Sequence, residues 1–354
     1  MLLKIFVFFK DIIKARYDFS YTGSLSTYYI MRYLYFISDG LLLKLIEFFL
    51  IRKRNFKKNL MFLFKNNNPT YKLIKKIKGE EIDLIINEIT KMDTIEGNEK
   101  KKIRFLNNKE RNLNKIDFNY YKNNKIVRLN FERNQLIHSN IIATFINNFL
   151  NEDFIKNAED FANCNLHLMG INSWITLPIP STQINSSISK YDQITKLYDA
   201  QQWHRDCDNL RDIKIFIYLS DVNDQSDGCF QIVENSNNFS FFSPFRYYNH
   251  RGFRVPNSTI INKYKSSIYS FFGNKGTSFL ADTRALHRGL AITKKKMRFM
   301  LEIYFSNHLF GQDKKYIIKK EHESYNTWKK MVSKNYELYS TLFKKETLID
   351  FANK

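Results

Sequence analysis

The pattern of hydrophobic and polar positions divides the chain into stretches of different character. From residue 1 to about 65, apolar residues recur at helical spacing and are interrupted by charged residues such as Lys10 and Glu47. From about Leu166 the pattern changes to short apolar runs separated by polar turns, which is typical of strands. These runs are LHLMGINSWITLPIP, IKIFIYLSDV, CFQIVE, GTSFLAD and MRFMLEIYFS. Since no long helical pattern separates them, the sequence predicts an antiparallel barrel or jelly roll and not a parallel α/β sheet.

Helical extensions are predicted on both sides of the strands, which gives a β-rich α+β fold. We expect a mostly helical N-terminal region at 1–124, the β core at 125–310, and a helical C-terminal extension at 311–354. Two helices are expected before the strands, at Ile141–Leu150 and Phe154–Phe161. In the C-terminal extension, a stripe of apolar residues at helical spacing predicts a docking face. Its members are Tyr325, Trp328, Val332, Tyr336, Tyr339 and Phe343.

The charge of the chain raises the question of a polyanionic partner. The 354 residues have a formal net charge of +21, which would suit a nucleic acid or an anionic membrane. The excess is mostly lysine scattered among Asn and Ile, without an RNA-binding signature, zinc-finger spacing or arginine-rich arm. We therefore expect no specific nucleic-acid partner. Three cysteines, Cys164, Cys207 and Cys229, are an odd number without metal-ligand spacing, which indicates a reducing compartment and a cytoplasmic protein.

The N-terminal arm, residues 1–65, leaves two interpretations open. Its longest apolar span, Gly40–Ile51, contains two charged residues and is too short to cross a bilayer, so no transmembrane helix is expected. Because Arg52, Lys53 and Arg54 follow this span, it could lie peripherally on an anionic membrane surface. The alternative is an amphipathic helix that packs on the β core with its basic end in solvent.

A candidate metal site begins with His204 and Asp206 in the segment QQWHRDCDN. Residues two apart on a strand project from the same face, so this imidazole and this carboxylate face the same way. They supply two ligands of a facial triad, which needs a second histidine and leaves the opposite coordination positions open. The pair alone is weak evidence, because a lone histidine is more often a structural residue than a ligand.

The third ligand has to come from elsewhere in the chain. The remaining histidines are His138, His167, His250, His287, His308 and His322. Only His287 lies just after one strand-like run and before another, in GTSFLADTRALHRGLAITKKKMRFMLEIYFS. We therefore predict that His204, Asp206 and His287 are the catalytic metal ligands.

Arg298 stands near the start of MRFMLEIYFS, where alternation places it on the face opposite to Phe299 and Leu301. An arginine that points into a barrel is costly unless it is paired, and a bidentately bound dicarboxylate is a suitable partner. The alternative is an arginine on a solvated face. The order of the residues, their strand context and the spacing from His287 to Arg298 together favour the site.

With these residues, the sequence resembles the phytanoyl-CoA dioxygenase family, within the wider 2-oxoglutarate oxygenase superfamily. The resemblance covers about Ile126 to Phe310 and includes WHRD, KIFIYLSDV, SDGCFQIVENS, and FLADTRALHRG with Arg298 beyond it. It implies a double-stranded β-helix, a cupin-like jelly roll, with Fe(II), 2-oxoglutarate and O2. In the resemblance, Arg298 holds the far carboxylate of 2-oxoglutarate. The chain departs from the family at Glu234–Asn237, where members often carry Pro-Gly-Ser-His, and it shows no feature for binding coenzyme A.

Other residues are candidates for contact with 2-oxoglutarate or the substrate. Thr176 and Tyr218 lie on runs that could line the barrel. Arg205 lies between the two ligands, although alternation equally supports an outward structural role. Lys294–Lys296, in the turn before Arg298, could steer an anionic substrate or form a solvated hairpin.

The predicted function is that of an Fe(II)- and 2-oxoglutarate-dependent dioxygenase. It would hydroxylate a small molecule or a lipid- or carbohydrate-type substrate and release succinate and CO2. One alternative is a cupin-like metal protein without 2-oxoglutarate turnover. A second is an inactive barrel that acts as a membrane-surface interaction module through its basic arm. Arg298 disfavours the first alternative, and the intact set of metal ligands disfavours the second.

Overall fold

The computed structural model describes residues 7, 9–10, 69–74, 76–96, 102–103, 117–123, 126–179, 199–206, 211–237, 255, 257–306 and 315–353. Apart from positions 7, 9 and 10, the predicted N-terminal arm with its span Gly40–Ile51 lies outside the described residues. Cys207, His250 and His308 lie outside them too. Among the helices that are described, none has the length and apolar character needed to cross a bilayer.

The larger of two antiparallel sheets contains eight strands in the described part of the chain. In spatial order they are β1 (Tyr71–Leu73), β9 (Ser278–Asp282), β6 (Asp212–Tyr218), β11 (Arg298–Ser306), β5 (His167–Thr176), β4 (Arg128–Phe131), β2 (Thr94–Glu96) and β3 (Lys102–Ile103). Every neighbouring pair is antiparallel, as the absence of intervening helical patterns predicts. β1, β2 and β3 come from before residue 124, so the sheet draws on both sides of that expected boundary.

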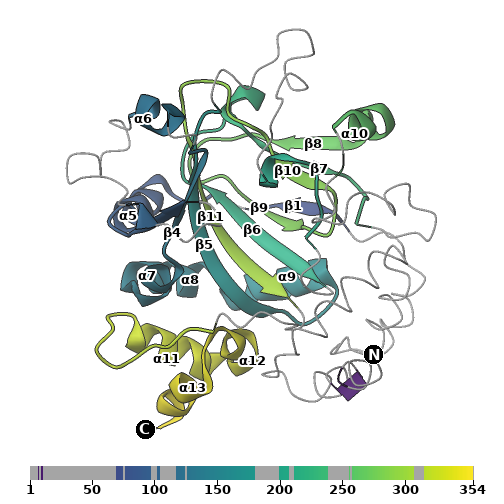
Figure 1. Ribbon diagram of the computed structural model, residues 1–354. Helices are drawn as coiled ribbons and strands as arrows, with labels where there is room; N and C mark the ends of the chain where they lie inside the picture. The colour runs from purple at the N-terminus through teal and green to yellow at the C-terminus, as the bar shows by residue number, and fades with distance from the viewer. Residues whose placement is uncertain are drawn as a thin grey trace.

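The smaller sheet has the strand order β10 (His287–Gly289), β7 (Phe230–Val233) and β8 (Ile268–Phe271). It lies beside the larger sheet, toward the upper right of Figure 1. The segment at His204 pairs with the outer edge of β10. The amide of His204 donates to the carbonyl of His287 at 3.0 Å, and the amide of His287 donates back at 2.9 Å. The β-rich α+β class with antiparallel sheets is thus confirmed.

Alternation along β11 separates two apolar layers. Phe299 and Leu301 belong to the outer core, in which the larger sheet packs against helices. Met300 faces the other way and packs between the two sheets with Trp174 and Phe279. The interior between the sheets is therefore lined by the alternate residues of β5, β6, β9 and β11.

Helices cover the outer face of the larger sheet (Figure 1). The α-helices after residue 70 are α5 (Gly79–Ile89), α6 (Phe118–Asn123), α7 (Arg133–His138), α8 (Asn140–Phe149), α9 (Glu152–Ala162), α10 (Asn257–Tyr264), α11 (Tyr325–Lys334), α12 (Tyr336–Tyr339) and α13 (Lys345–Ala352). The two helices predicted before the strands are α8 and α9, which match to within two residues. Side-chain caps fix their starts: Ser139 Oγ accepts from the amide of Ile142 at 3.4 Å, and Asn151 Oδ1 accepts from that of Phe154 at 2.8 Å.

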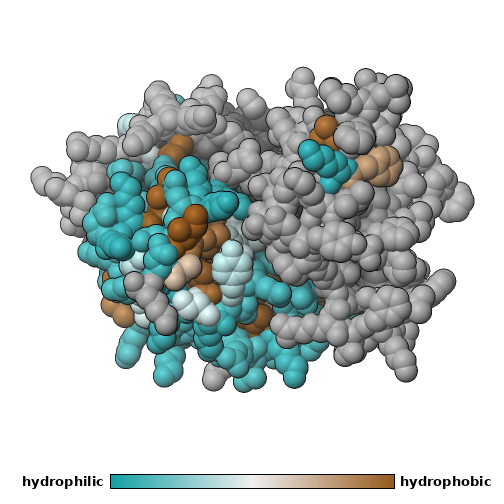
Figure 2. Space-filling model, turned by 90° about the horizontal axis from the view of Figure 1, so that it is seen from below, coloured by the Kyte–Doolittle hydropathy of each residue, from teal (hydrophilic) through white to brown (hydrophobic). Residues whose placement is uncertain are grey.

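The C-terminal helices dock through the predicted apolar stripe. Its buried members are Tyr325, Trp328, Val332, Tyr339 and Phe343. Tyr336 was expected among them and is instead 54% exposed. The reason is that α11 ends at Lys334 and Asn335 caps a new helix by accepting from the amide of Leu338 at 3.1 Å, which resets the helical spacing. Seen from below, this end of the molecule shows a hydrophobic area surrounded by hydrophilic side chains (Figure 2).

Trp328 provides a test of this docking. It is fully buried, its Nε1 donates to the carbonyl of Ile137 at 2.8 Å, and its ring meets Phe343 edge to face at 5.3 Å. We expect Trp328→Ala to lower the free energy of unfolding by about 3–5 kcal/mol, because it leaves a cavity and removes the hydrogen bond to Ile137. Tyr336→Ala should change it by less than about 0.5 kcal/mol. Urea unfolding measures both, and equal effects would contradict the docking.

A second prediction concerns pH. His138 stacks on His322 with ring centroids 3.8 Å apart, and its Nε2 lies 3.1 Å from the carbonyl oxygen of Ile317. Burial lowers the pKa of His138 below its usual 6.5, and His322 lowers it further, against the backbone hydrogen bond that raises it. Since the folded state prefers the neutral ring, stability is complete above about pH 6.5 and falls as the pH drops below it. Urea unfolding across this range should show a smaller loss of unfolding free energy for His138→Gln than for wild type. Equal losses would show that His138 is not the group responsible.

Candidate metal centre

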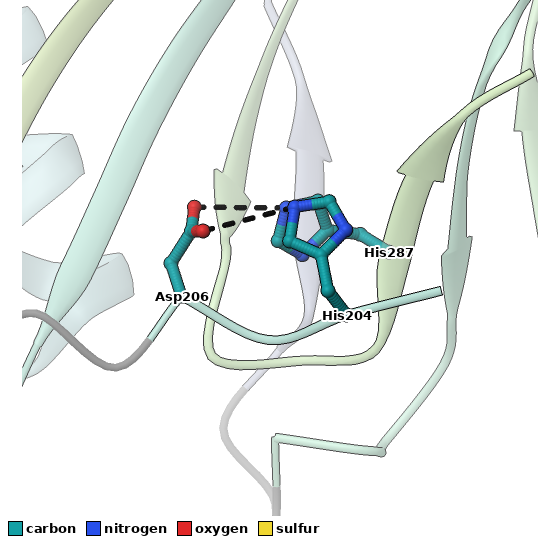
Figure 3. A group of neighbouring side chains, drawn as sticks. All are labelled: His204, Asp206 and His287. Carbon is teal, nitrogen blue, oxygen red and sulfur yellow. Dashed lines mark ion pairs between the residues drawn. The ribbon is translucent and has the colours of Figure 1, made fainter. Parts of the chain in front are cut away.

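Three side chains from distant parts of the chain meet beside the smaller sheet. His204 and Asp206 come from the segment that pairs with β10, and His287 begins β10 itself. One ligand atom from each lies within 4.8 Å of the others. Nε2 of His204 is 3.8 Å from Oδ1 of Asp206, and Nε2 of His287 is 3.6 Å from Oδ2. Both rings turn these nitrogens toward the carboxylate (Figure 3). The structure thus brings the three predicted ligands together.

The backbone selects the tautomer of both histidines. Nδ1 of His204 lies 2.7 Å from the carbonyl oxygen of Gln202, and Nδ1 of His287 lies 2.9 Å from that of Ala285. A carbonyl only accepts, so Nδ1 carries the proton in each ring. Nε2 then carries the lone pair and points at Asp206, which is the arrangement that a metal-binding histidine needs.

A network behind the ligands holds their loops in place. The amide of Asp206 donates to the carbonyl of Thr283 at 2.8 Å. The Arg284 guanidinium forms two bonds to the buried carboxylate of Asp282, at 2.9 and 2.6 Å. Asn237 donates to that same carboxylate at 3.1 Å. Asp282 and Arg284 thereby fix the turn that leads from β9 to His287.

Lys214 on β6 sets the charge state of the carboxylate ligand. Its Nζ donates to Oδ2 of Asp206 at 2.8 Å. Burial alone would raise the pKa of Asp206, but the positive charge of Lys214, followed by the two histidines, outweighs it and holds the pKa well below its usual range. The same attraction raises the pKa of Lys214 against the effect of burial. Asp206 is thus an anion at neutral pH.

The donor set fits a divalent transition metal. Two neutral imidazoles and one carboxylate, all on one side of the space between them, form the facial triad that suits Fe(II) and leaves positions open for other ligands. An ion bound here would draw the three ligand atoms closer together. The side chains themselves are already in the required tautomer and charge state.

A row of polar side chains continues from Lys214 across the interior face of the larger sheet. Nζ of Lys214 also lies 3.6 Å from Oε2 of Glu302, and Asn172 donates to Oε1 of Glu302 at 2.5 Å. Tyr304 donates its hydroxyl to Asp212. Strand alternation places Glu302 on the same face as Arg298, but the sequence analysis gave Glu302 no role and missed Lys214. The available signal was a lysine inside the apolar run KIFIY.

Arg298 points into the interior, as alternation predicts, and lies on the same sheet face as Met300. It is 5% exposed. One guanidinium nitrogen, Nη2, donates to Thr176 Oγ1 at 3.3 Å, while Nε and Nη1 are buried and have no hydrogen-bond partner among the residues that the structure describes. Burial lowers the pKa of Arg298 from its usual value, with Tyr218 and Cys229 opposing the effect. The guanidinium therefore has two nitrogens with which it can bind an anion.

Gly289 explains how the guanidinium fits beside β10. A Cβ at this position would lie 2.5 Å from Nη2 and 3.1 Å from Nη1 of Arg298, so any other residue would displace the guanidinium. Gly289 is two residues beyond His287 on the same strand. The strand that carries the candidate ligand His287 thus also borders the candidate anion site.

Tyr218 and Cys229 complete the surroundings of Arg298. The Tyr218 hydroxyl donates to the carbonyl of Phe271 at 2.9 Å and accepts from the amide of Phe230 at 3.0 Å. It therefore ties β6 to both β7 and β8, and we expect it to support the site by joining the sheets. Burial raises the pKa of the Cys229 thiol to about 11, although Arg298 opposes this.

The remaining candidates lie outside the interior. Arg205 is buried and its Nη1 donates to the carbonyl of Arg284 at 3.3 Å, which agrees with the structural alternative for this residue. Lys294 forms an ion pair with Asp224, and Lys296 lies 3.2 Å from Asp227. These two lysines are therefore already paired with carboxylates on the neighbouring turn.

Comparisons with known proteins add little to this geometry. No family model and no curated protein matches the chain, so the resemblance to the phytanoyl-CoA dioxygenase family is not confirmed. Among solved structures, HygX from Streptomyces hygroscopicus with nickel and 2-oxoglutarate bound is 13% identical with a TM-score of 0.43, covering 77% of this chain and 94% of that one. The epimerase SnoN in complex with Fe3+, alpha ketoglutarate and nogalamycin RO is 11% identical with a TM-score of 0.42, covering 67% and 79%.

EctD from S. alaskensis with 2-oxoglutarate and 5-hydroxyectoine is 12% identical with a TM-score of 0.38, covering 68% of this chain and 72% of that one. A likeness this low does not transfer an activity to this chain. The function has to be inferred from the side chains described above.

The ligand assignment predicts a specific loss of metal binding. His287→Ala should remain folded and weaken Fe(II) or Co(II) binding by at least about 100-fold, because a facial triad without one ligand loses its chelate geometry. His322→Ala, which changes a histidine far from the triad, should bind the metal as wild type does. Anaerobic titration with the metal measures both, and wild-type affinity in His287→Ala would refute the assignment.

Proposed function

We propose that this protein is an Fe(II)- and 2-oxoglutarate-dependent dioxygenase of the 2-oxoglutarate oxygenase superfamily, and that it hydroxylates a polar small molecule. Arg298 is the observation that carries the proposal. Its guanidinium is buried, two of its nitrogens have no hydrogen-bond partner in the described part of the chain, and it lies in the same interior as a two-histidine, one-carboxylate triad. Buried charges are normally paired, so the missing partner is a ligand with an anionic group.

The spacing along β10 suits a short dicarboxylate. Gly289, which touches the Arg298 guanidinium, lies two residues from His287, and two residues of a strand span about 7 Å. A five-carbon diacid spans about 5 Å between its end carbons. 2-Oxoglutarate has this length, a carboxylate for Arg298 and a keto-acid end that chelates iron.

The arrangement of the sheets supports a double-stranded β-helix. The His204 segment, β10, β7 and β8 run side by side, and the larger sheet faces them across an apolar interior. Such a core carries ligands on adjacent strands of one sheet, as His204 and His287 are here.

In the proposed reaction, bound Fe(II) and 2-oxoglutarate activate O2, which converts 2-oxoglutarate to succinate and CO2 and adds one oxygen atom to a C–H bond of the substrate. The chain's own residues position these partners. His204, His287 and Asp206 hold the metal, while Arg298 and Thr176 bind the far carboxylate. Phe279 and other apolar residues between the sheets exclude water from that end of the site.

The polar side chains that extend from Asp206 indicate the class of the substrate. Lys214, Glu302 and Asn172 extend from Asp206 over the interior face of the larger sheet, and Asn172 Oδ1 is a buried acceptor without a partner among the described residues. An aliphatic chain would leave the Asn172 acceptor unpaired beside two charged side chains, which is costly. A substrate with hydroxyl or amino groups can donate to this acceptor, so a carbohydrate-type or similarly polar molecule fits better than a lipid.

The two alternative functions receive less support. A cupin-like metal protein without 2-oxoglutarate turnover would have no use for an unpaired buried arginine. A membrane-surface module would depend on the N-terminal arm, which lies outside the described residues. Peripheral membrane contact and the cytoplasmic location remain predictions from the sequence.

Anaerobic reconstitution tests the function directly. The purified protein, loaded with Fe(II), should bind 2-oxoglutarate with a charge-transfer absorption band and, once O2 is admitted with a panel of polar substrates, release succinate and a product heavier by one oxygen atom. Asp206→Ala is the matched negative. A wild-type protein that binds Fe(II) but neither binds nor consumes 2-oxoglutarate would refute the proposal.

Replacing Arg298 should raise the stability of the protein and remove its response to 2-oxoglutarate. Arg298→Met removes an unpaired buried charge, so the metal-free variant should be more stable than wild type by about 1 kcal/mol or more. Ligand-linked stabilisation should disappear: 2-oxoglutarate at 100 times its Kd adds about 2.7 kcal/mol to the metal-loaded wild type and nothing to the variant. Thermal unfolding with and without 2-oxoglutarate measures both effects.

Arg284→Met is the matched control, because Arg284 is equally buried and fully paired with Asp282. Removing one partner of a buried ion pair costs about 3–5 kcal/mol. The two arginine variants should therefore shift stability in opposite directions. A destabilised Arg298→Met that still responds to 2-oxoglutarate would show that Arg298 has a structural role only.

A further inference from the structure

Lys214 occupies a position that the proposed function has not yet explained. It projects from β6 into the interior, and its ammonium lies between two carboxylates, 2.8 Å from Oδ2 of Asp206 and 3.6 Å from Oε2 of Glu302. The ring of Tyr304 lies 5.0 Å from Nζ and covers a further side of the charge. The ammonium is thus held in one place by groups from two segments, the one that contains Asp206 and strand β11.

The two oxygens of Asp206 have different surroundings as a result. Oδ2 accepts the hydrogen bond of Lys214 and lies 3.6 Å from Nε2 of His287. Among the described residues, Oδ1 has no comparable donor, and it lies 3.8 Å from Nε2 of His204. A strong charge-assisted bond occupies Oδ2, so Oδ1 is the oxygen left for a metal.

We propose that Lys214 is a positioning residue that confines Asp206 to coordination through one oxygen and thereby keeps a metal position open. The inference rests on the proposed function, because the open position matters only if ligands such as 2-oxoglutarate and O2 have to share the metal. A carboxylate can bind a metal through one or both oxygens. With both bound, Asp206 would fill a fourth position and leave too few for a chelating co-substrate and O2 together.

Glu302 holds the lysine in register. It lies opposite Asn172 in the pairing of β11 with β5, and the Asn172 amide donates to Oε1, which leaves Oε2 for Lys214. The order Asn172, Glu302, Lys214, Asp206 therefore runs from the middle of the larger sheet to the metal ligands. Each member fixes the orientation of the next.

Water on bound Mn(II) reports the coordination mode without turnover. An octahedral ion with three protein ligands keeps about three positions for water, and water-proton relaxation counts them. We expect Lys214→Met to release Oδ2, to lose one water relative to wild type, and to bind 2-oxoglutarate about tenfold or more weakly in the Mn(II)-loaded protein. Circular dichroism and thermal unfolding check that the variant is folded.

Two further variants make the experiment decisive. Lys214→Gln keeps a hydrogen-bond donor for one carboxylate, so it can still fold if the methionine variant is unstable. Because it lacks the charge-assisted bond, its bound Mn(II) should also have one water fewer than in wild type. Lys296→Met is the control. It removes another lysine that is paired with a carboxylate, that of Asp227 at 3.2 Å, and should keep the wild-type number of bound waters. An unchanged water count in both Lys214 variants would overturn the inference, even if they were less stable.

The failure of this inference differs from failure of the proposed function. If wild type binds Mn(II) and 2-oxoglutarate while the Lys214 variants keep the same water count, only the role of Lys214 falls. If wild type binds the metal but no 2-oxoglutarate, and the variants lose a water, the proposed function falls and Lys214 keeps its role. If wild type binds no metal, both are wrong.

Discussion

The guanidinium of Arg298 is buried between two sheets and has no anionic partner among the described residues, which costs free energy. Its neighbours reduce that cost without cancelling it. Thr176 accepts one hydrogen bond from Arg298, and Gly289 leaves the room that any Cβ would fill. Tyr218 lies close by, but its hydroxyl is committed to the backbone of the smaller sheet. The fold thus holds a charge in place and leaves its compensation to a ligand, as a preorganised binding site does.

The candidate metal ligands depend on the backbone in a similar way. Reciprocal amide–carbonyl bonds between His204 and His287 fix the distance between the two strands that carry them. Carbonyl oxygens then fix the ring tautomers, and Lys214 fixes the charge of Asp206. All of these contacts are made by groups of the chain itself. The energetic cost is a cluster of partly buried charges, which the hydrophobic layers on both sides of the larger sheet have to offset.

The sequence contained the parts of this site whose geometry follows from strand periodicity. Alternation alone places His204 with Asp206 and turns Arg298 away from Phe299, because the side-chain period of a strand is fixed. His287 followed from its place between two strand-like runs. Periodicity cannot show which charged groups meet across strands, so it missed the contact of Lys214 with Asp206 and Glu302. It also missed that Lys294 and Lys296 are paired with Asp224 and Asp227, since these pairs join turns separated by about 70 residues. Tyr336 was misplaced for a local reason, because the cap at Asn335 interrupts the helical period.

Cys229 lies beside Arg298 in an interior where the proposed chemistry would generate strong oxidants. Thiols are oxidised mainly as thiolates, and with a pKa of about 11 only about one molecule in ten thousand carries a thiolate here at neutral pH. The apolar wall that isolates the guanidinium thus also keeps this sulfur protonated. The burial that isolates Arg298 therefore also protects the Cys229 thiol from oxidation.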